Sequence, residues 1–371
     1  MCRAQLLKLC KCTAFFLTDS LFIFPISIFH FVEEFSIQVK LIWFHCGTFA
    51  QIFLQMLQSH TGEIVSLVVA CLWTGSALSF EYVGKRIGSL MVNILRLIVG
   101  GLMLSGLLWF INGNPFPVGA STETWIWMLI SGFVGFVFGD MCLFHSYLII
   151  TSRFSQLIMT LAPPIAAIFG YALLGEHMSF VAIIAMLITL FGIAFAIFGR
   201  ETNTNKTSIK LNLPLRGVLL ALGGAVGQGL GIVLSKKGMD IYALSIPADI
   251  LVNNANYIPF AATQIRIFAG IAGFIMVILL MRQGHRILPA IKDTKAMRIL
   301  TIGSFCGPFA GVSLSLLAIS YIETGIASTI MAIVPIIIIV PSVLLFKQKV
   351  TSREIIGAII SVIGVALLFR Y

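Results

Sequence analysis

The sequence predicts an all-helical integral membrane protein with about ten transmembrane helices, arranged as two inverted five-helix repeats. Three observations lead to this fold class: a very hydrophobic composition, a series of long apolar segments, and an internal repeat. Hydrophobic residues make up 59% of the chain and charged residues only 10%. These proportions exclude an ordinary soluble domain with a polar surface.

Apolar segments of roughly 18 to 25 residues recur from Gly62 onward, and each is long enough to cross a hydrocarbon core of ~30 Å as a helix. Their predicted ranges are 63–82, 89–111, 125–149, 154–174, 179–198, 217–235, 258–281, 298–321, 325–346 and 352–370.

An internal repeat relates the two halves of the chain. Alignment of Pro163 with Pro335 gives a repeat offset of 335 − 163 = 172 in the numbering. The same offset pairs Phe133 with Phe305, Gly135 with Gly307, Gly139 with Gly311, Met159 with Met331, Gly192 with Gly364 and Ala194 with Ala366. The sequence is therefore organised as one membrane unit that occurs twice.

The repeat and the polar segments define the expected domains. Residues 61–199 form the first repeat, 200–216 a polar linker, and 217–371 the second repeat. Residues 1–60 form an atypical leader without a counterpart in the repeat. Three interpretations of the leader stay open: an extra anchor helix, a loosely ordered leader, or an upstream extension before a start at Met56, which we favour.

The loops set the expected orientation. The net charge is 24 − 14 = +10, and the Lys and Arg residues gather in the loops after odd-numbered spans. The positive-inside rule places those loops in the cytoplasm and the C-terminal Tyr371 outside. Five spans per repeat then give the two halves opposite orientations. Nucleic acid is not an expected partner, because no basic groove with interleaved aromatic residues is present.

No cofactor or metal is expected. The seven cysteines are an odd number, and Cys10-Lys-Cys12 does not have the usual zinc-ligand spacing. The phosphate-binding motif GxxxxGK[ST] does not occur. ATP is therefore not the expected energy source.

Two segments carry a resemblance to a known family. The fourth span contains LAPPIAAIFGYALLGE at 161–176, and the fifth ends LFGIAFAIFGR at 190–200. With paired five-helix halves, they resemble the EamA-type branch of the drug/metabolite transporter superfamily over about residues 62–371. The resemblance implies a ten-helix carrier that moves small metabolites or drugs by alternating access. It also implies a central cavity lined by the first four helices of each half, with the fifth and tenth helices outside.

Small residues recur at a spacing of four, which places them on one helix face where backbones can approach closely. We interpret them as helix-packing positions. They are Gly135 and Gly139, Gly307 and Gly311, and the stripe Gly223, Gly227 and Gly231.

Prolines interrupt the fourth and ninth spans. Pro163, Pro164 and Pro335 remove backbone donors and are hinge candidates. The alternative, a static kink filled by neighbouring helices, stays open. Pro163 and Pro335 are the stronger candidates, because they recur at equivalent positions.

Asp140 is the leading candidate for a functional group. It lies about ten residues inside its span, or ~15 Å, which is the centre of the bilayer. An ionised carboxylate there costs on the order of 2.5–3.5 kcal/mol unless it is paired or faces water. Asp140 is thus expected either to couple protons or contact substrate, or to act as a hydrogen-bonded structural group.

Arg96 and Arg266 occur at matching places in the second and seventh spans, each about eight residues inside its helix. Either arginine is expected to grip an anionic substrate group, to pair with Asp140, or to serve the scaffold. Further candidates for polar or stacking contacts in a cavity are Trp73, Asn93, Gln228, Gln264, Tyr147 and Tyr321. Glu176, near a membrane surface, is expected to serve as a cap or loop residue.

These observations predict a secondary active transporter of a small organic metabolite or drug in the cell membrane, proton-coupled or exchange-driven. Its expected partners are a small-molecule substrate and the lipid bilayer, and it is expected to be a monomer or a homodimer. The alternatives are a nucleotide-sugar or cation carrier of the same superfamily, a membrane-embedded enzyme, and a non-transporting receptor or scaffold. A cation pathway is disfavoured because only one convincing intramembrane acid is present.

Overall fold

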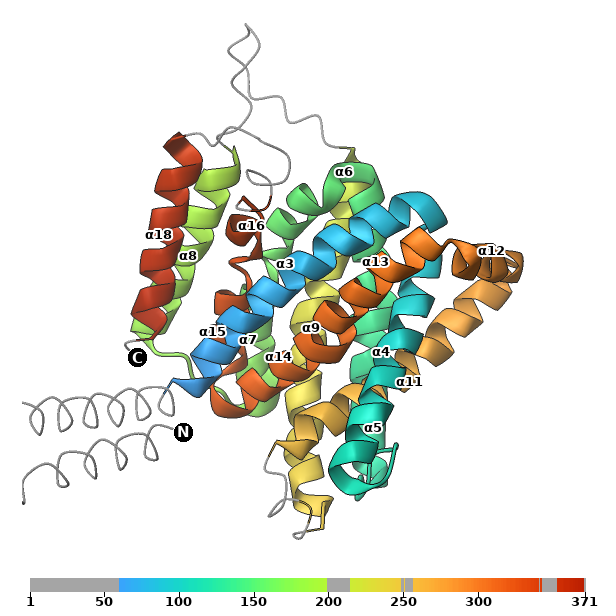
Figure 1. The fold of residues 1–371 in the computed structure, drawn as a ribbon. Helices are drawn as coiled ribbons and strands as arrows, with labels where there is room; N and C mark the ends of the chain where they lie inside the picture. The colour runs from blue at the N-terminus through green and yellow to red at the C-terminus, as the bar shows by residue number, and fades with distance from the viewer. Residues whose placement is uncertain are drawn as a thin grey trace, which may run out of the picture. The chain divides into compact units, whose positions relative to one another are not determined.

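The computed structural model describes residues 60–198, 214–247, 250, 256–339, 341 and 352–369. These residues form helices joined by short connections, with no strand among them (Figure 1). All but the last residue of the leader predicted for residues 1–60, and most of the linker predicted for 200–216, lie outside the described residues.

The first half contains seven helical segments. They are α3 (Thr61–Ile87), α4 (Ser89–Asn112), α5 (Thr122–Gly132), the π-helix η1 (Phe133–Asp140), α6 (Met141–Met159), α7 (Ala162–Leu174) and α8 (Phe180–Phe198).

The second half repeats this order, with η2 and α12 added and with two segments, α14 and α15, where the first half has α6. The segments are α9 (Leu215–Ser245), α11 (Tyr257–Leu280), the 3₁₀ turn η2 (Gly284–Arg286), α12 (Ile287–Lys292), α13 (Thr294–Ser304), the π-helix η3 (Phe305–Phe309), α14 (Ala310–Tyr321), α15 (Thr324–Met331), α16 (Val334–Ile337) and α18 (Ser352–Leu368).

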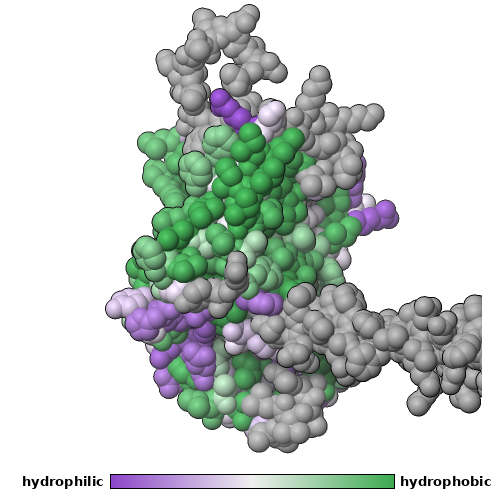
Figure 2. Space-filling model, turned by 90° about the vertical axis from the view of Figure 1, so that its left-hand side faces the viewer, coloured by the Kyte–Doolittle hydropathy of each residue, from purple (hydrophilic) through white to green (hydrophobic). Residues whose placement is uncertain are grey.

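Seven stretches of the described chain are helical, long and apolar enough to cross a membrane, and three shorter apolar helices accompany them. The seven correspond to the predicted spans that begin near residues 63, 89, 125, 154, 217, 258 and 298. Figure 2 shows hydrophobic side chains over most of the coloured part of one face. Phe180, Phe191 and Ile363 are among the large apolar side chains exposed on α8 and α18. A multi-pass membrane protein is confirmed.

The internal repeat has structural counterparts. The π-helices η1 and η3 begin at Phe133 and Phe305, which the repeat offset pairs. The spans predicted as fourth and ninth are each broken just before a proline, at Thr160-Leu161 and Ala332-Ile333, and the same offset relates these breaks. The two halves therefore distort their helices at equivalent places.

The three proline hinge candidates lie at the starts of helices, which corrects the alternative of a kink within a continuous helix; their role as hinges stays a prediction. Pro163 and Pro164 lie at the first positions of α7, and Pro335 at the start of α16. At those positions an amide N–H would have no intrahelical partner, so a proline costs no hydrogen bond. The interruption lies in the turns before them.

A second correction concerns Lys236 and Lys237, which lie just beyond the predicted span 217–235 and were therefore expected in a loop. The helix α9 continues through both residues to Ser245. The predicted span ended at residue 235 because the apolar run ends there, whereas the backbone stays helical beyond that point. Lys236 is therefore held on a helix that packs against both halves.

The predicted glycine packing is confirmed at the contact between η1 and α9. A Cβ atom placed on Gly231 would lie 3.1 Å from the Cα of Gly135, and one on Gly139 would lie 3.2 Å from the Cα of Gly227. Only glycines allow the two backbones to approach this closely. This contact fixes the position of Asp140, the last residue of η1.

Candidate functional site

A cavity of about 100 Å³ lies between the two halves of the chain. Its volume is on the scale of cavities that hold a single six-membered ring. Its lining comes from α3, α4, η1, α6 and α7 of the first half and from α9, α11, η3, α14, α15 and α16 of the second. The predicted site residues that line it are Trp73, Arg96, Asp140, Tyr147, Pro163, Gln228 and Arg266.

Asp140 is held by a closed network on the cavity wall. Its carboxylate accepts a short charge-assisted hydrogen bond from Nη2 of Arg96. Nε of Arg96 donates to Oδ1 of Asn93 at 3.2 Å, and Nδ2 of Asn93 donates to the backbone oxygen of Asp140 at 3.4 Å. The Arg96 guanidinium also lies 4.5 Å from the ring centre of Phe144. Asp140 and Arg96 are thus ionic partners that neutralise each other.

Arg266 is in a different situation. Its side chain is buried, with 5% of the residue exposed, and it lines the same cavity. Its Nε has no hydrogen-bond partner. Asp140 interacts with Arg266 electrostatically but makes no direct ion pair with it in the described part of the chain; its direct ion pair is with Arg96. Its guanidinium lies 4.8 Å from the ring centre of Phe136, a cation–π contact. A Cβ atom on Gly135 would lie 2.9 Å from its Nη2, so this glycine makes the room for it.

The cavity extends toward one end of the helical unit. Tyr147 and Gln156 both line it, and Nε2 of Gln156 donates to the Tyr147 hydroxyl at 2.7 Å. Close to them, Glu81 accepts hydrogen bonds from the backbone N–H, at 3.1 Å, and the hydroxyl of Ser152. This contact ties α3 to α6 at that end.

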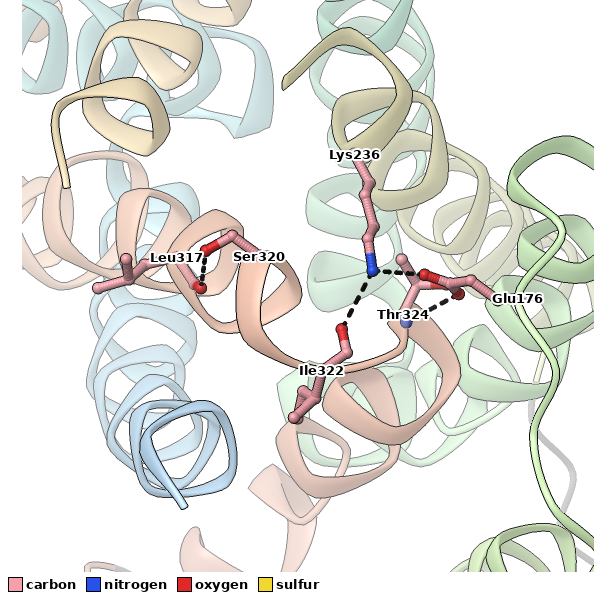
Figure 3. Close-up of polar contacts among 6 residues, drawn as sticks. All are labelled: Glu176, Lys236, Leu317, Ser320, Ile322 and Thr324. Carbon is pink, nitrogen blue, oxygen red and sulfur yellow. Dashed lines mark hydrogen bonds and ion pairs between the residues drawn. The ribbon is translucent and has the colours of Figure 1, made fainter. Parts of the chain in front are cut away.

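Toward the opposite end lies the Glu176 cluster, which we define as Glu176, Lys236, Ile322 and Thr324 (Figure 3). Nζ of Lys236 donates to Oε1 of Glu176 at 2.6 Å and to the Ile322 backbone oxygen at 3.3 Å. Oε2 of Glu176 accepts from the N–H of Thr324 at 3.0 Å and from its hydroxyl at 2.6 Å. Glu176 therefore caps the start of α15 and joins the first half to the second.

Two contacts between the first and second halves of the chain lie at opposite ends of the helix α3. Near its start, a Cβ atom on Gly62 would lie 2.8 Å from Ile322, in the Glu176 cluster. Near its end, Arg86 bonds Asp293 at 2.9 Å. The 27 residues of α3 separate these contacts by ~40 Å. Trp73, which lines the cavity, lies near the middle of the helix.

The remaining predicted site residues lie away from the cavity lining. Asn93 supports the Asp140 pair. Gln264 donates to Ser105 at 2.7 Å and to the Pro115 backbone oxygen at 2.8 Å, so it fastens the segment after α4. Tyr321 is 53% exposed, and Pro164 and Pro335 begin their helices without lining the cavity.

Four further residues of the candidate site were not predicted from the sequence. Phe136 and Phe144 contact the buried arginines, Gln156 binds Tyr147, and Lys236 binds Glu176. Phe136, Asp140 and Phe144 are spaced by four, so they share a helix face, which is a signal available in the sequence. The partners of Gln156 and Lys236 depend on how separate helices pack, and no local pattern marks them.

The fold and the cavity define the class of protein: a multi-pass helical membrane protein with a charged cavity between two related halves. No group of three His, Cys, Asp or Glu side chains in the described part of the chain could hold a metal ion. The EamA-like transporter family matches residues 60–198 and 215–370. The chain therefore belongs to the EamA-like transporter family.

Solved structures agree with this fold. Twenty-seven chains match, and one crystal structure superposes with a TM-score of 0.57 at 15% sequence identity, covering 83% of this chain and 95% of that chain. At this identity the likeness shows the fold alone. No curated protein matches the sequence.

Proposed function

We propose that the protein is a secondary active transporter that moves a small organic metabolite across the cell membrane by alternating access, driven by a proton gradient or by exchange. The observation that carries the proposal is the cavity halfway along α3, with charged side chains contributed by both halves. Charged groups at this depth are expensive unless they serve transport or pair with one another. A scaffold gives no reason for such a cavity, and a receptor would bind a ligand there without flux.

Reciprocal contacts between α8 and α18 support the inverted repeats that the proposed mechanism requires. The Ser361 hydroxyl donates to the Thr189 backbone oxygen at 3.3 Å. A Cβ atom on Gly192 would lie 2.5 Å from Ser361, and Gly364 likewise packs against Thr189. The repeat offset exchanges the members of these contacts. Reciprocal contacts of this kind are characteristic of a two-fold relation, and inverted halves exchange conformations when a carrier alternates.

We assign the structure to a state closed at the Glu176 end. Lys236 lies one helical turn, ~6 Å, beyond the cavity residue Ile232 on α9. The Lys236 and Glu176 side chains are 19% and 11% exposed, so their ion pair is largely shielded from water. The Arg86–Asp293 pair at the other end is 40% and 23% exposed. Opening the Glu176 end requires separating the cluster.

The first experiment tests transport. Purified protein is screened by thermal shift against amino acids, nucleosides, sugars, organic anions and lipophilic cations, and each stabilising compound is then tested for flux in proteoliposomes with and without a pH gradient. We expect saturable flux of at least one compound. For proton coupling, Asp140→Asn should abolish the response to the gradient while the protein still folds. Stabilising compounds that never cross the bilayer would refute the function.

The second experiment tests the closed end. A Ser328→Cys reporter on the cavity wall is placed in a background without other reactive cysteines and labelled with an impermeant thiol reagent applied to the Glu176 side. We expect Glu176→Gln, which keeps the shape of the side chain but removes its charge, to increase the labelling rate. Asp293→Asn is the matched control, because it alters the opposite end. Equal labelling in the three proteins would exclude the Glu176 cluster as a gate.

A further inference from the structure

We infer that the cavity binds a small organic anion and that Arg266 is the residue that binds its charged group. This inference rests on the proposed transport function and names the substrate class for the same cavity. It begins with the charges of the cavity wall. Among its lining residues, Arg96 and Arg266 are cationic and Asp140 is anionic, which gives 2 − 1 = +1.

The positive charge is localised on Arg266. Asp140 and Arg96 hydrogen-bond directly, and Asn93 satisfies further donors and acceptors of that pair. No such partner exists for Arg266 in the described part of the chain, and its buried Nε is unsatisfied. A guanidinium buried inside a membrane protein is costly without an anion. The missing partner is supplied when the ligand brings one.

Local packing keeps the Arg266 guanidinium ready for such a ligand. The Phe136 ring lies against it at 4.8 Å, and this contact orients the guanidinium plane without neutralising the charge. The glycine at position 135 leaves the space that Nη2 occupies. Arginine offers several N–H donors in a fixed plane, which matches carboxylate, sulfonate and phosphate groups.

The other residues that line the cavity indicate the size and polarity of the uncharged part of the ligand. Trp73, Phe136, Phe144 and Tyr147 contribute aromatic surface to the cavity, and its volume is about 100 Å³. A compact apolar or aromatic body fits this lining, and one anionic group balances the single uncompensated charge. The substrate class is therefore a small organic monoanion.

The test uses three probes of similar shape and different charge: benzenesulfonate, benzenesulfonamide and phenyltrimethylammonium. Each has one phenyl ring and one tetrahedral group, and the two ions keep their charge at every working pH. Binding to the purified protein is measured by thermal shift and by titration in low-chloride buffer. We expect benzenesulfonate to bind and to raise the melting temperature more than the neutral and cationic probes.

Variants assign the binding to the arginine. Arg266→Gln should weaken benzenesulfonate binding by about tenfold or more, the range for a lost charge-assisted contact. Arg266→Lys should retain part of the affinity, because it retains the charge. The control is Arg298→Gln, which removes an exposed arginine on α13 outside the cavity. Since Arg266→Lys keeps the cation, it also reports on the site if Arg266→Gln does not fold.

The outcomes separate this inference from the proposed function. Benzenesulfonate that binds through Arg266 but does not cross proteoliposome membranes would support the anion site and count against transport of this class. Flux of a cationic or neutral compound without benzenesulfonate binding would support transport and overturn the anion site. Equal benzenesulfonate affinity in the wild-type, Arg266→Gln and Arg298→Gln proteins would also overturn it.

Discussion

Arg96 and Arg266 lie at matching depths in the two halves, and their surroundings differ. Arg96 has a carboxylate, an amide and three aromatic rings around it. Arg266 has one ring and no anion bonded to it among the described residues. Each half therefore carries one buried arginine, in the corresponding helices α4 and α11, and only Arg96 is bonded to an anion. We propose that structural support and ligand binding are divided between the halves in this way.

The largest expected effect comes from removing Arg96, the arginine that is paired with Asp140. Arg96→Met leaves the largely buried Asp140 without its cation, and removal of one partner from a buried pair typically costs about 3–5 kcal/mol. We expect the free energy of unfolding in detergent to fall by about this amount. In an Asp140→Asn background the same change should cost much less, because no anion remains to be satisfied. An equal cost in both backgrounds would contradict the pairing.

The second prediction concerns Arg266, the arginine without a bonded anion. Arg266→Met removes an unpaired buried cation, so the ligand-free protein should keep its stability or gain up to about 2 kcal/mol. The measurement is thermal unfolding without ligand, alongside Arg96→Met. A loss as large as that of Arg96→Met would mean that Arg266 has a structural partner after all, and the two positions would then be equivalent.

A third change disturbs one arginine without touching the other. Gly135→Ala places a methyl group 2.9 Å from Nη2 of Arg266, so the guanidinium must shift. We expect a stability loss of about 1 kcal/mol or less, because the end of a long side chain yields easily, together with a severalfold loss of benzenesulfonate affinity. Gly106→Ala is the control, since a Cβ atom there meets open space. Unchanged affinity in Gly135→Ala would separate the glycine from the anion site.

The smallest effect is expected for the Arg86–Asp293 ion pair, which is more exposed to water than the Arg96–Asp140 pair. Arg86 donates hydrogen bonds to Asp293, which hold the pKa of that carboxyl below its ordinary value. A lowered pKa contributes stability above the unfolded value of about 3.9, and this contribution is lost as the pH falls through the folded value. Asp293→Asn should thus melt slightly below the wild type at neutral pH, and the gap should close on acidification. A gap independent of pH would assign the effect to packing.

The sequence was sufficient for the spans because apolar length is a local property. Hydropathy gives the seven long spans and the positions of Asp140 and Arg96 within theirs. The segments 161–176 and 190–200, together with the paired halves, indicate the family. The repeat offset also located the positions where both halves break their helices.

The partners of the charged residues could not be predicted in the same way. Whether Arg96 or Arg266 pairs with Asp140 depends on helix rotation, and the π-helix η1 changes that rotation just before Asp140. The position of Lys236 was missed for a related reason. Hydropathy ends the span at residue 235, but α9 continues and carries the lysine to the carboxylate of Glu176, which belongs to the other half of the chain.

The helices α8 and α18 lie side by side in Figure 1, and in the described chain they contribute nothing to the cavity lining. Their mutual contact is nevertheless tight, because Gly192 and Gly364 bring the backbones together. Evolutionary selection for a particular substrate therefore does not act directly on these two helices. A chimera that borrows both as a unit from a relative should inherit the lipid preferences of the donor while keeping the chemical selectivity of the recipient.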